Sequence, residues 1–349
     1  MAWQDVCLNL TDHNLLVNCL HGLLLTVTMP STMNGAYSRD KTAKFMLIVG
    51  QEPCSSIEFD IGHEINAVTF SANDKYLVSG GSEGVRVWRA HDGKHIASMD
   101  VQDVSCLAVS KDGRWIAAGS FVGCAFVWDA TTYQQAFEHL NEGVCTAVDF
   151  SPDATALVAS WSNTATIWSI PAGQPVRKLN HQEPVGAARY SPRGDRIATA
   201  SKTYVLVWDS NDGRLLVDIK VDAIPWRNTG LVWCDDHLFV ASKNKIKRFD
   251  ASTGSTISEW PVPDTTSNPS CIALPEHGKF LAYSATETTF WGTSTHTQLF
   301  PVPQYQDTCK IALTLDGRVL AIAAANGRVA IKHLSHLIVR LFTVGFGRI

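Results

Sequence analysis

The sequence predicts an all-β fold, a seven-bladed β-propeller of four-stranded antiparallel blades. Three observations lead to this prediction. Tryptophan recurs at a spacing of 40 residues, each unit repeats the same succession of short apolar segments and polar turns, and residues 61–333 contain no stretch with sustained helical periodicity. A unit of about 40 residues with four short strands has the size of one propeller blade.

The period is marked by an aromatic residue that ends the third strand of each unit. Tryptophan fills only 11 of 349 positions, yet four of the markers are tryptophans at steps of 40 residues, and the phase continues at steps of 41, 42 and 42 residues to His333. The aromatic markers are predicted to anchor blade packing: Trp88, Trp128, Trp168, Trp208, Phe249 and Trp291.

Each unit opens with a first strand, such as residues 106–110 or 147–151, and a polar turn follows it, as in residues 111–114. Glycine, aspartate and asparagine in such turns supply positive φ angles and side-chain hydrogen bonds to the backbone. The second segment is almost continuously apolar, as in residues 115–118 and 319–322. A strand of this kind is predicted to be buried on both faces.

The third strand ends on the aromatic marker, as in residues 205–208, and a turn rich in glycine and aspartate leads out of it. A fourth, more polar segment such as residues 215–219 then completes the unit. Four antiparallel strands in about 40 residues make one propeller blade.

The two ends of the repeat array leave two alternatives open. Either residues 57–60 or residues 337–343 add the outer strand of the last blade and so close the ring. In addition, residues 45–49 keep the phase one unit upstream, so residues 14–60 are an alternative, degenerate eighth blade. Seven blades are favoured, because residues 29–43 lack the turn and strand pattern of the other units.

Composition limits the classes of partner and compartment. The chain has 29 basic and 33 acidic residues, a formal net charge of −4, and 45% apolar residues, so a folded protein is expected and nucleic acid is not expected as a partner. The longest apolar stretch, residues 15–29, is too short and too interrupted to span a membrane, and no membrane association is expected. Nine cysteines without any C-x-x-C pair favour free thiols in an intracellular, cytoplasmic protein, with the nucleus as the alternative.

The repeats resemble those of the WD-repeat (WD40) β-propeller family, and in particular the repeat arrays common in fungal proteins. Copies in this family end in Trp-Asp and often open with Gly-His. Trp128-Asp129 and Trp208-Asp209 match the ending, Phe249-Asp250 nearly matches it, and Gly62-His63 matches the opening. The resemblance divides the chain into a divergent N-terminal segment, residues 1–54, and a WD-repeat β-propeller, residues 55–349. The alternative for the N-terminal segment is a degenerate blade.

One departure from the family pattern concerns a buried tetrad. Full copies of the family carry an aspartate in the turn between the second and third strands, where it joins a histidine, a serine or threonine and the tryptophan in a hydrogen-bonded network. None of the seven corresponding turns contains an aspartate, as residues 82–84 and 202–203 illustrate. No blade is therefore predicted to hold the complete tetrad, and packing is expected to stabilise the blades instead.

No catalytic, cofactor-binding or metal-binding residue is predicted. The 12 histidines form no H-E-x-x-H or H-x-H motif, the glycines at residues 80–84 lack a P-loop lysine, and Asp235-Asp236 lies in a turn. Cysteines at or near the first-strand position that alanine fills in other units are interpreted as small packing residues rather than reactive thiols: Cys106, Cys145, Cys271 and Cys309.

The family resemblance implies a non-catalytic scaffold that binds other proteins or peptides through the loops of one propeller face. The alternatives are a propeller hydrolase with paired carboxylates at the channel mouth, and a nuclear reader of histone tails or other peptides, which would need an acidic pocket at the channel.

The predicted binding face consists of the loops that lead into the first strands and the turns that join second to third strands. Aromatic and arginine side chains are common interface anchors. The candidates from the turns are Phe121, Trp161 and Tyr204, and those from the leading loops are His63, His181, Trp226 and Arg227. Trp226 and Arg227 are the best of these, because the repeat requires no large aromatic residue in that loop.

Removing a marker should destabilise the protein. We expect Trp168→Ala and Trp208→Ala each to lower the free energy of unfolding by about 3–5 kcal/mol, because each deletes a large side chain from a packed interior. Urea unfolding followed by fluorescence measures the change. Losses below about 1 kcal/mol for both variants would show that the phase of the repeat is misassigned.

Overall fold

The computed structural model describes residues 56–334, except residues 141–142, 223–229, 243, 263–270, 285–287, 302–307 and 325, together with five short strands outside that range. The described residues form strands and turns, with no helix and hence no helix that could cross a membrane. The contacts divide the chain into two compact units. One unit is Cys54–Ser335, and the other joins Met1–Pro53 to His336–Ile349.

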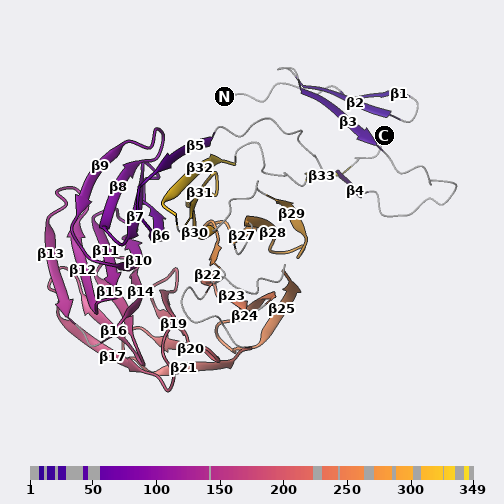
Figure 1. Cartoon of the computed structure of the whole chain (residues 1–349). Helices are drawn as coiled ribbons and strands as arrows, with labels where there is room; N and C mark the ends of the chain where they lie inside the picture. The colour runs from indigo at the N-terminus through magenta and orange to yellow at the C-terminus, as the bar shows by residue number, and fades with distance from the viewer. Residues whose placement is uncertain are drawn as a thin grey trace. The chain divides into compact units, whose positions relative to one another are not determined.

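The larger unit is a ring of seven four-stranded antiparallel sheets, which confirms the predicted β-propeller (Figure 1). Blade 1 comprises β6 Ile65–Phe70, β7 Tyr76–Gly81, β8 Gly84–Arg89 and β9 His95–Met99. Blade 2 comprises β10 Val104–Val109, β11 Trp115–Ser120, β12 Cys124–Asp129 and β13 Gln135–Leu140. Blade 3 comprises β14 Cys145–Phe150, β15 Ala156–Trp161, β16 Thr164–Ser169 and β17 Pro175–Asn180.

Blades 4 to 7 repeat this order. Blade 4 comprises β18 Ala187–Tyr190, β19 Arg196–Ala200, β20 Tyr204–Asp209 and β21 Leu215–Lys220, and blade 5 comprises β22 Leu231–Cys234, β23 His237–Ser242, β24 Lys245–Asp250 and β25 Thr256–Pro261. Blade 6 comprises β26 Cys271–Ala273, β27 Phe280–Ser284, β28 Thr288–Gly292 and β29 Gln298–Pro301. Blade 7 comprises β30 Thr308–Leu313, β31 Val319–Ala324, β32 Arg328–His333 and β5 Ser56–Asp60.

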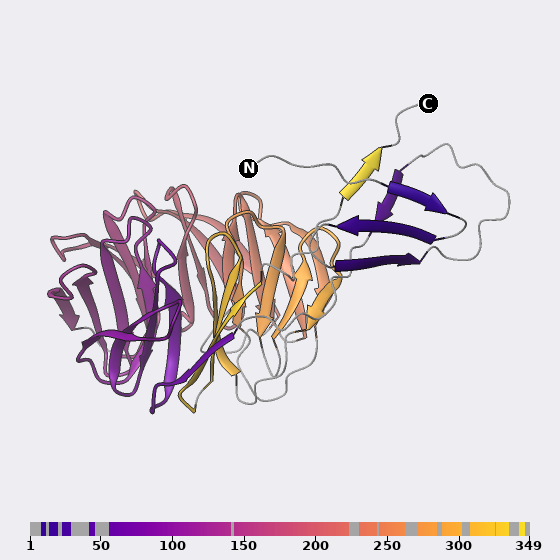
Figure 2. The ribbon, with the colours of Figure 1, turned by 90° about the horizontal axis from the view of Figure 1, so that it is seen from above.

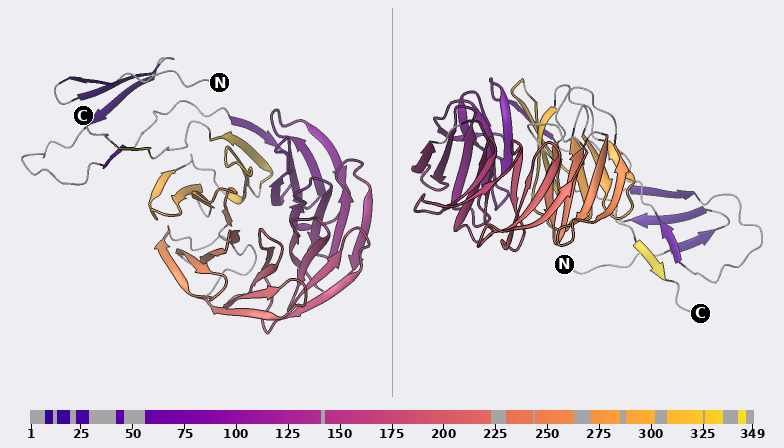
Figure 3. Two further views of the ribbon diagram at one scale, coloured as in Figure 1. Left: turned by 180° about the vertical axis from the view of Figure 1, so that it is seen from behind. Right: turned by 90° about the horizontal axis from the view of Figure 1, so that it is seen from below.

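Residues of the first strands line the central cavity. The strands run between the two faces of the ring, so the connections gather at those faces (Figures 2 and 3). Each second strand is buried on both faces, as predicted. All six residues of β11 are buried, and small side chains such as Ala117 and Ala118 allow the neighbouring blades to approach.

The ring is closed by the N-terminal strand. β5 pairs antiparallel with β32, with Phe59 opposite Val329 and Ile57 opposite Ile331. Of the two sequence alternatives, residues 57–60 therefore supply the outer strand of blade 7. Residues 337–341 lie outside the described part of the chain.

The alternative of an eighth blade from residues 14–60 is not what the structure shows. β2 Asn14–Cys19 and β3 Leu23–Thr28 pair with β1 Leu8–Thr11 in a separate three-stranded sheet, and β4 Thr42–Phe45 pairs with β33 Phe342–Gly345. These strands belong to the smaller unit, whereas β5 belongs to blade 7. The division into domains at residues 54 and 55 stays a prediction.

The six predicted aromatic anchors are all buried, and each lies opposite an aliphatic residue of the second strand, as Trp88 does opposite Leu77. In blade 7 the phase differs by one residue from the prediction. Lys332, not His333, lies opposite Leu320 at the anchor position. Lys332 is buried there, and a lysine can pack its long aliphatic stem against apolar neighbours.

Two kinds of polar turn recur around the ring. Between the first and second strands, a side-chain hydroxyl donates a hydrogen bond to a carboxylate of the turn and accepts one from the first backbone N–H of the second strand. In blade 2, for example, Ser110 Oγ lies 2.6 Å from Asp112 Oδ1 and 2.9 Å from the backbone nitrogen of Trp115. After the third strand, Asp129, Asp209 and Asp250 each accept two backbone N–H groups. These bonds lower the pKa of Asp250 to about 2, the hydroxyl and N–H of Ser252 being the main donors.

Ring closure also depends on packing between the first and last blades. The rings of Phe59 in β5 and Trp88 in blade 1 have centroids 5.2 Å apart, and Gly93 in blade 1 adjoins the Phe59 ring closely enough that a Cβ on this glycine would lie 2.8 Å from it. β5 therefore joins blade 7 by backbone pairing and blade 1 by side-chain contact.

We expect Phe59→Ala to lower the free energy of unfolding by about 2 kcal/mol, since it removes part of the contact between blades 7 and 1 from a half-buried site. Urea unfolding gives the value. Ser56→Ala, at an exposed position of the same strand, is the matched control and should change the stability by less than about 0.5 kcal/mol. Equal effects of the two substitutions would contradict the role of Phe59.

Candidate protein-binding face and central cavity

The loops leading into the first strands and the turns between second and third strands lie together on one face, here called the loop face. Backbone hydrogen bonds connect them. The N–H of His181 donates to Asn163 in the turn of blade 3, and the N–H of Val185 in the same loop donates to Ser162. Glu183 turns toward the next blade and accepts hydrogen bonds from Ser201 and Thr203.

The same pattern holds elsewhere on the loop face. Ser82 in the turn of blade 1 donates to Glu64, Asp103 in the next loop donates to Ser82, and Phe121 donates to Asp103 through its backbone N–H. Each of these loops therefore bridges the turns of two neighbouring blades. A surface built in this way is held in shape by backbone bonds and leaves its outward side chains free to contact a partner.

Trp161 was predicted to lie on this face, and that prediction is wrong. It is the last residue of β15, pairs with Thr164 across the turn, and is only 1% exposed. Its ring packs edge-on against the anchor Trp168 with centroids 6.2 Å apart. The turn after it contains only two residues, so Trp161 remains in the strand and points into the contact between blades.

His181 lies in the predicted loop but is engaged in a hydrogen-bonded chain. Trp208 Nε1 lies 2.8 Å from Thr199 Oγ1, which lies 2.8 Å from His181 Nε2, and His181 Nδ1 lies 2.9 Å from the carbonyl oxygen of Leu179. Since a carbonyl only accepts, Nδ1 carries the proton and the hydroxyl of Thr199 donates to Nε2. The carbonyl of Leu179 thus does what the missing aspartate does in the family tetrad.

The surroundings of His181 in blade 4 favour the neutral form of its imidazole. Burial lowers the pKa of His181 to about 4, against the weaker opposing effect of the backbone groups of Leu179 and Asn163. In blade 1, Trp88 donates to Ser79 at 2.8 Å, but His63 lies with Nδ1 3.1 Å from the oxygen of Glu64, and within the described groups its Nε2 has no partner. Only blade 4, among the fully described ones, joins histidine, hydroxyl and tryptophan.

The remaining candidates stay predictions. His63, Phe121 and Tyr204 are half-buried on or beside the loop face, and Tyr204 is the first residue of β20 rather than a turn residue. Trp226 and Arg227 lie outside the described residues. Two exposed residues of the loop face are not among the candidates predicted from the sequence: Val122, which is 60% exposed in the turn of blade 2, and Lys202, in the turn of blade 4. An apolar residue between Phe121 and Gly123 in a short turn was a usable signal for Val122.

The first strands surround a central cavity of about 150 Å³, to which all seven blades contribute. Its charged lining residues in the described part of the chain are Arg189 and Lys310. Arg189 donates to the carbonyl oxygens of Ala188 and Val148, at 3.0 and 3.4 Å. Nearby Asp149 accepts the N–H of Tyr190 at 2.8 Å, and burial raises its pKa to about 6 although Arg189 opposes the shift.

Polar residues at β-bulges of the first strands bond to the neighbouring blade around this cavity. Asn66 donates to Val104, Ser105 donates to Cys145, and Thr146 donates to Val185, each through its side chain to a backbone carbonyl of the next blade. A bulge in β6, β10 and β14 places these side chains toward the neighbouring blade.

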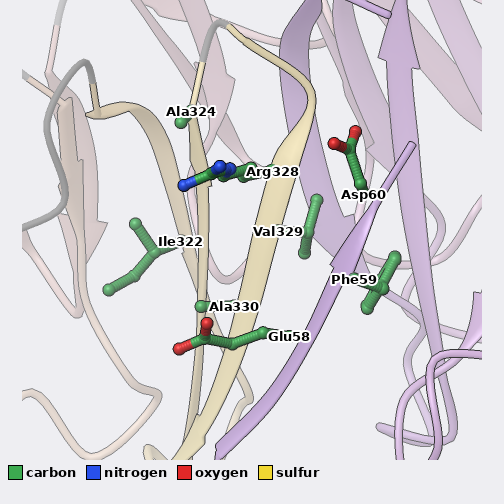
Figure 4. Close-up of a pocket in the computed structure, with 8 residues that line it drawn as sticks. All are labelled: Glu58, Phe59, Asp60, Ile322, Ala324, Arg328, Val329 and Ala330. Atoms are coloured by element: carbon green, nitrogen blue, oxygen red, sulfur yellow. The ribbon is translucent and has the colours of Figure 1, made fainter. Parts of the chain in front are cut away.

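A second hollow of about 350 Å³ lies on the ring-closing sheet, lined by β5, β31 and β32 (Figure 4). Ile322 and Ala330 form apolar lining, and the carboxylate of Glu58 and the guanidinium of Arg328 lie on either side of Ala330. Asp60 is already engaged, because its Oδ1 accepts the N–H of Gly62 at 2.8 Å. We interpret this hollow as part of the closing sheet.

Comparison with known proteins agrees with this architecture. Residues 54–89, 92–129, 132–169 and 173–209 match the family model described as "WD domain, G-beta repeat". The chain is similar to a component of chromatin assembly factor 1 of Gallus gallus, with 28% identity over 160 residues that cover 44% of this chain and 25% of that protein.

Two further similarities extend over more of the chain. WD repeat-containing protein 18 of Danio rerio is 24% identical over 237 residues, which cover 60% of this chain and 53% of the relative. The matches thus span between about a quarter and a half of these two curated relatives. A solved chain in the structure titled "Crystal Structure of Mitotic Checkpoint Complex" is 15% identical, covers 88% of this chain and 99% of its own length, and superposes with a TM-score of 0.70.

The pKa of His181 predicts a pH-dependent stability. The unfolded imidazole titrates near 6.5 and the folded one near 4, so as the pH falls through this window the unfolded state takes up a proton that the folded state does not. We expect the wild-type protein to lose about 3 kcal/mol of unfolding free energy between pH 7 and pH 4 from this group. In His181→Gln this part of the loss should disappear.

Urea unfolding at a series of pH values measures the effect. The matched control is His91→Gln, which removes a histidine whose side chain is 71% exposed. If His181→Gln and His91→Gln show the same slope as the wild type, the hydrogen-bonded chain in blade 4 does not control the titration.

Proposed function

Because the chain is a WD40-repeat β-propeller, we propose that it is a non-catalytic scaffold that assembles other proteins on its loop face. Propellers of this family serve in general as platforms for protein interaction. The observation that carries the proposal for this chain is the loop face itself, whose loops and turns are tied by backbone bonds while side chains such as Val122 and Lys202 face solvent.

The contents of the central cavity weigh against the alternatives. A glycoside hydrolase needs two carboxyl groups at one site, but the described residues that line the cavity include no carboxylate. A reader of basic histone tails needs an acidic pocket, whereas Arg189 and Lys310 make the described lining basic. Both features favour a scaffold over the hydrolase and the histone-tail reader.

We further propose that the protein works in a reducing, intracellular compartment, with the cytoplasm first and the nucleus second. The support is chemical. The five cysteines that the structure describes, Cys106, Cys124, Cys145, Cys234 and Cys271, are all free thiols. Imaging of the tagged full chain in living cells tests this proposal, and secretion of the chain would overturn it.

The scaffold proposal is tested by affinity purification of the tagged full chain with mass spectrometry of its partners. Val122→Asp places a charge in the exposed turn of the loop face, and Trp226→Ala/Arg227→Ala removes the two candidates of the loop before blade 5. We expect each variant to lose at least tenfold of the partner signal while its thermal unfolding is unchanged, because interface anchors carry most of the binding energy.

The matched control is Leu216→Asp, on the outer strand of blade 4. Leu216 is also an exposed aliphatic residue, but it lies away from the loop face. It should keep the wild-type partners. Retention of every partner by both loop-face variants, or loss of partners only in Leu216→Asp, would overturn the assignment of the face.

A further inference from the structure

Two cysteines lie side by side where blades 2 and 3 meet next to the central cavity. Cys106 is in β10 and Cys145 is in β14, the innermost strands of these blades. Cys106 is half-buried and lines the cavity, whereas Cys145 is fully buried. Ser105 lies beside the pair and holds the two strands together through its bond to the carbonyl oxygen of Cys145.

The absence of a side chain at Gly119 makes room for both sulfurs. Gly119 in β11 lies opposite Cys106. A Cβ at this glycine would lie 2.4 Å from Cys145 Sγ and 2.6 Å from Cys106 Sγ. Since both sulfurs lie so close to one point, they are within about 5 Å of each other. A disulfide between them requires the two sulfurs to approach to about 2.05 Å.

The surroundings differentiate the two thiols. A hydrogen bond from Cys145 lowers the pKa of Cys106, the hydroxyl of Ser105 and the charge of Arg189 act in the same direction, and burial opposes them. Burial raises the pKa of Cys145 well above its ordinary value, and its contact with Cys106 adds to the shift. Of the pair, Cys106 is thus the more readily ionised thiol, and it is also the one that lines the cavity.

Blade 6 provides an internal comparison. Cys271 occupies the same register as Cys106, opposite Ser284 as Cys106 is opposite Gly119, and it lines the same cavity. In the next blade, however, Thr308 holds the register position of Cys145. Cys271 therefore has the location of Cys106 without a second cysteine at the partner position.

We propose that Cys106 and Cys145 form a reactive thiol pair, in which Cys106 is oxidised by a small hydroperoxide that enters the central cavity and Cys145 resolves the product to a disulfide between blades 2 and 3. A cavity of about 150 Å³ has room for a molecule the size of hydrogen peroxide.

The reaction proceeds in two displacements. The Cys106 thiolate attacks one peroxide oxygen, so an S–O bond forms, the O–O bond breaks, and the second oxygen leaves as hydroxide, which takes up a proton to give water. The Cys145 sulfur then gives up its proton and attacks the sulfenic sulfur of Cys106. An S–S bond forms, the S–O bond breaks, and a second water leaves. Two thiols lose two electrons in total, and hydrogen peroxide is reduced to two waters.

The test treats the reduced full chain with hydrogen peroxide and identifies the products by non-reducing peptide mass spectrometry. We expect a Cys106–Cys145 disulfide in the wild type and none in Cys106→Ala. In Cys145→Val the reaction should stop at the sulfenic acid, which dimedone traps on Cys106. Both variants use residues that other blades carry at these positions, namely Ala67 and Val104, so the fold should be retained.

The nucleophilic reactivity of Cys106 provides a second measurement. With limiting iodoacetamide at neutral pH, Cys106 should be alkylated at least tenfold faster than Cys271, because both line the cavity and, among the described side chains, only Cys106 has a second thiol beside it. Equal rates at the two cysteines would overturn the proposal. So would a peroxide-treated wild type in which Cys106 and Cys145 both remain free thiols, or one in which the disulfide joins a different pair.

Discussion

Every blade of this propeller depends on closure of the ring. A four-stranded sheet with an apolar second strand must be covered on both faces, and a linear array of seven blades would leave one face of the first and one of the last in water. The pairing of β5 with β32, together with the contact of Phe59 with Trp88, covers these two faces at once. The burial of the second and third strands throughout blades 1 and 7 is a consequence of this closure.

Within the ring, packing does most of what buried polar networks do in full family copies. Ser79 and Thr199 supply a hydroxyl to the tryptophan of blades 1 and 4, whereas the corresponding residues of blades 2 and 3 are Ala118 and Ala159. An alanine there leaves no buried hydroxyl to satisfy, so blades 2 and 3 do not need a hydroxyl partner at this position. Hydrogen bonds instead concentrate at the two faces of the ring and around the cavity, where bulged polar residues of the first strands bond to the neighbouring blade.

The same crowding connects the scaffold with its proposed chemistry. Innermost strands approach so closely that glycine, alanine and cysteine are favoured there, which is why the sequence analysis interpreted the cysteines as packing residues. That interpretation and the proposed reactivity of Cys106 are compatible. Small side chains are common at this position, although blade 7 carries Lys310 there. Cys145 in the adjacent blade gives the thiol of Cys106 a partner that Cys271 does not have among the described side chains.

The sequence by itself determined the features that repeat within one unit: the all-β class, the seven blades, the polar turns, the doubly buried second strands and the aromatic anchors from Trp88 to Trp291. These depend on residues within about 40 positions of each other, and sevenfold repetition makes the signal strong. Only the tertiary structure decided which terminus closes the ring and that Lys332 holds the last anchor position. It also showed that Trp161 is buried and that the carbonyl of Leu179 takes the place of the missing aspartate beside His181. Finally, it showed that two cysteines 39 residues apart meet at Gly119. Each of these results depends on bulge positions, strand register or contacts between blades, and the spacing of residues along the chain does not fix them.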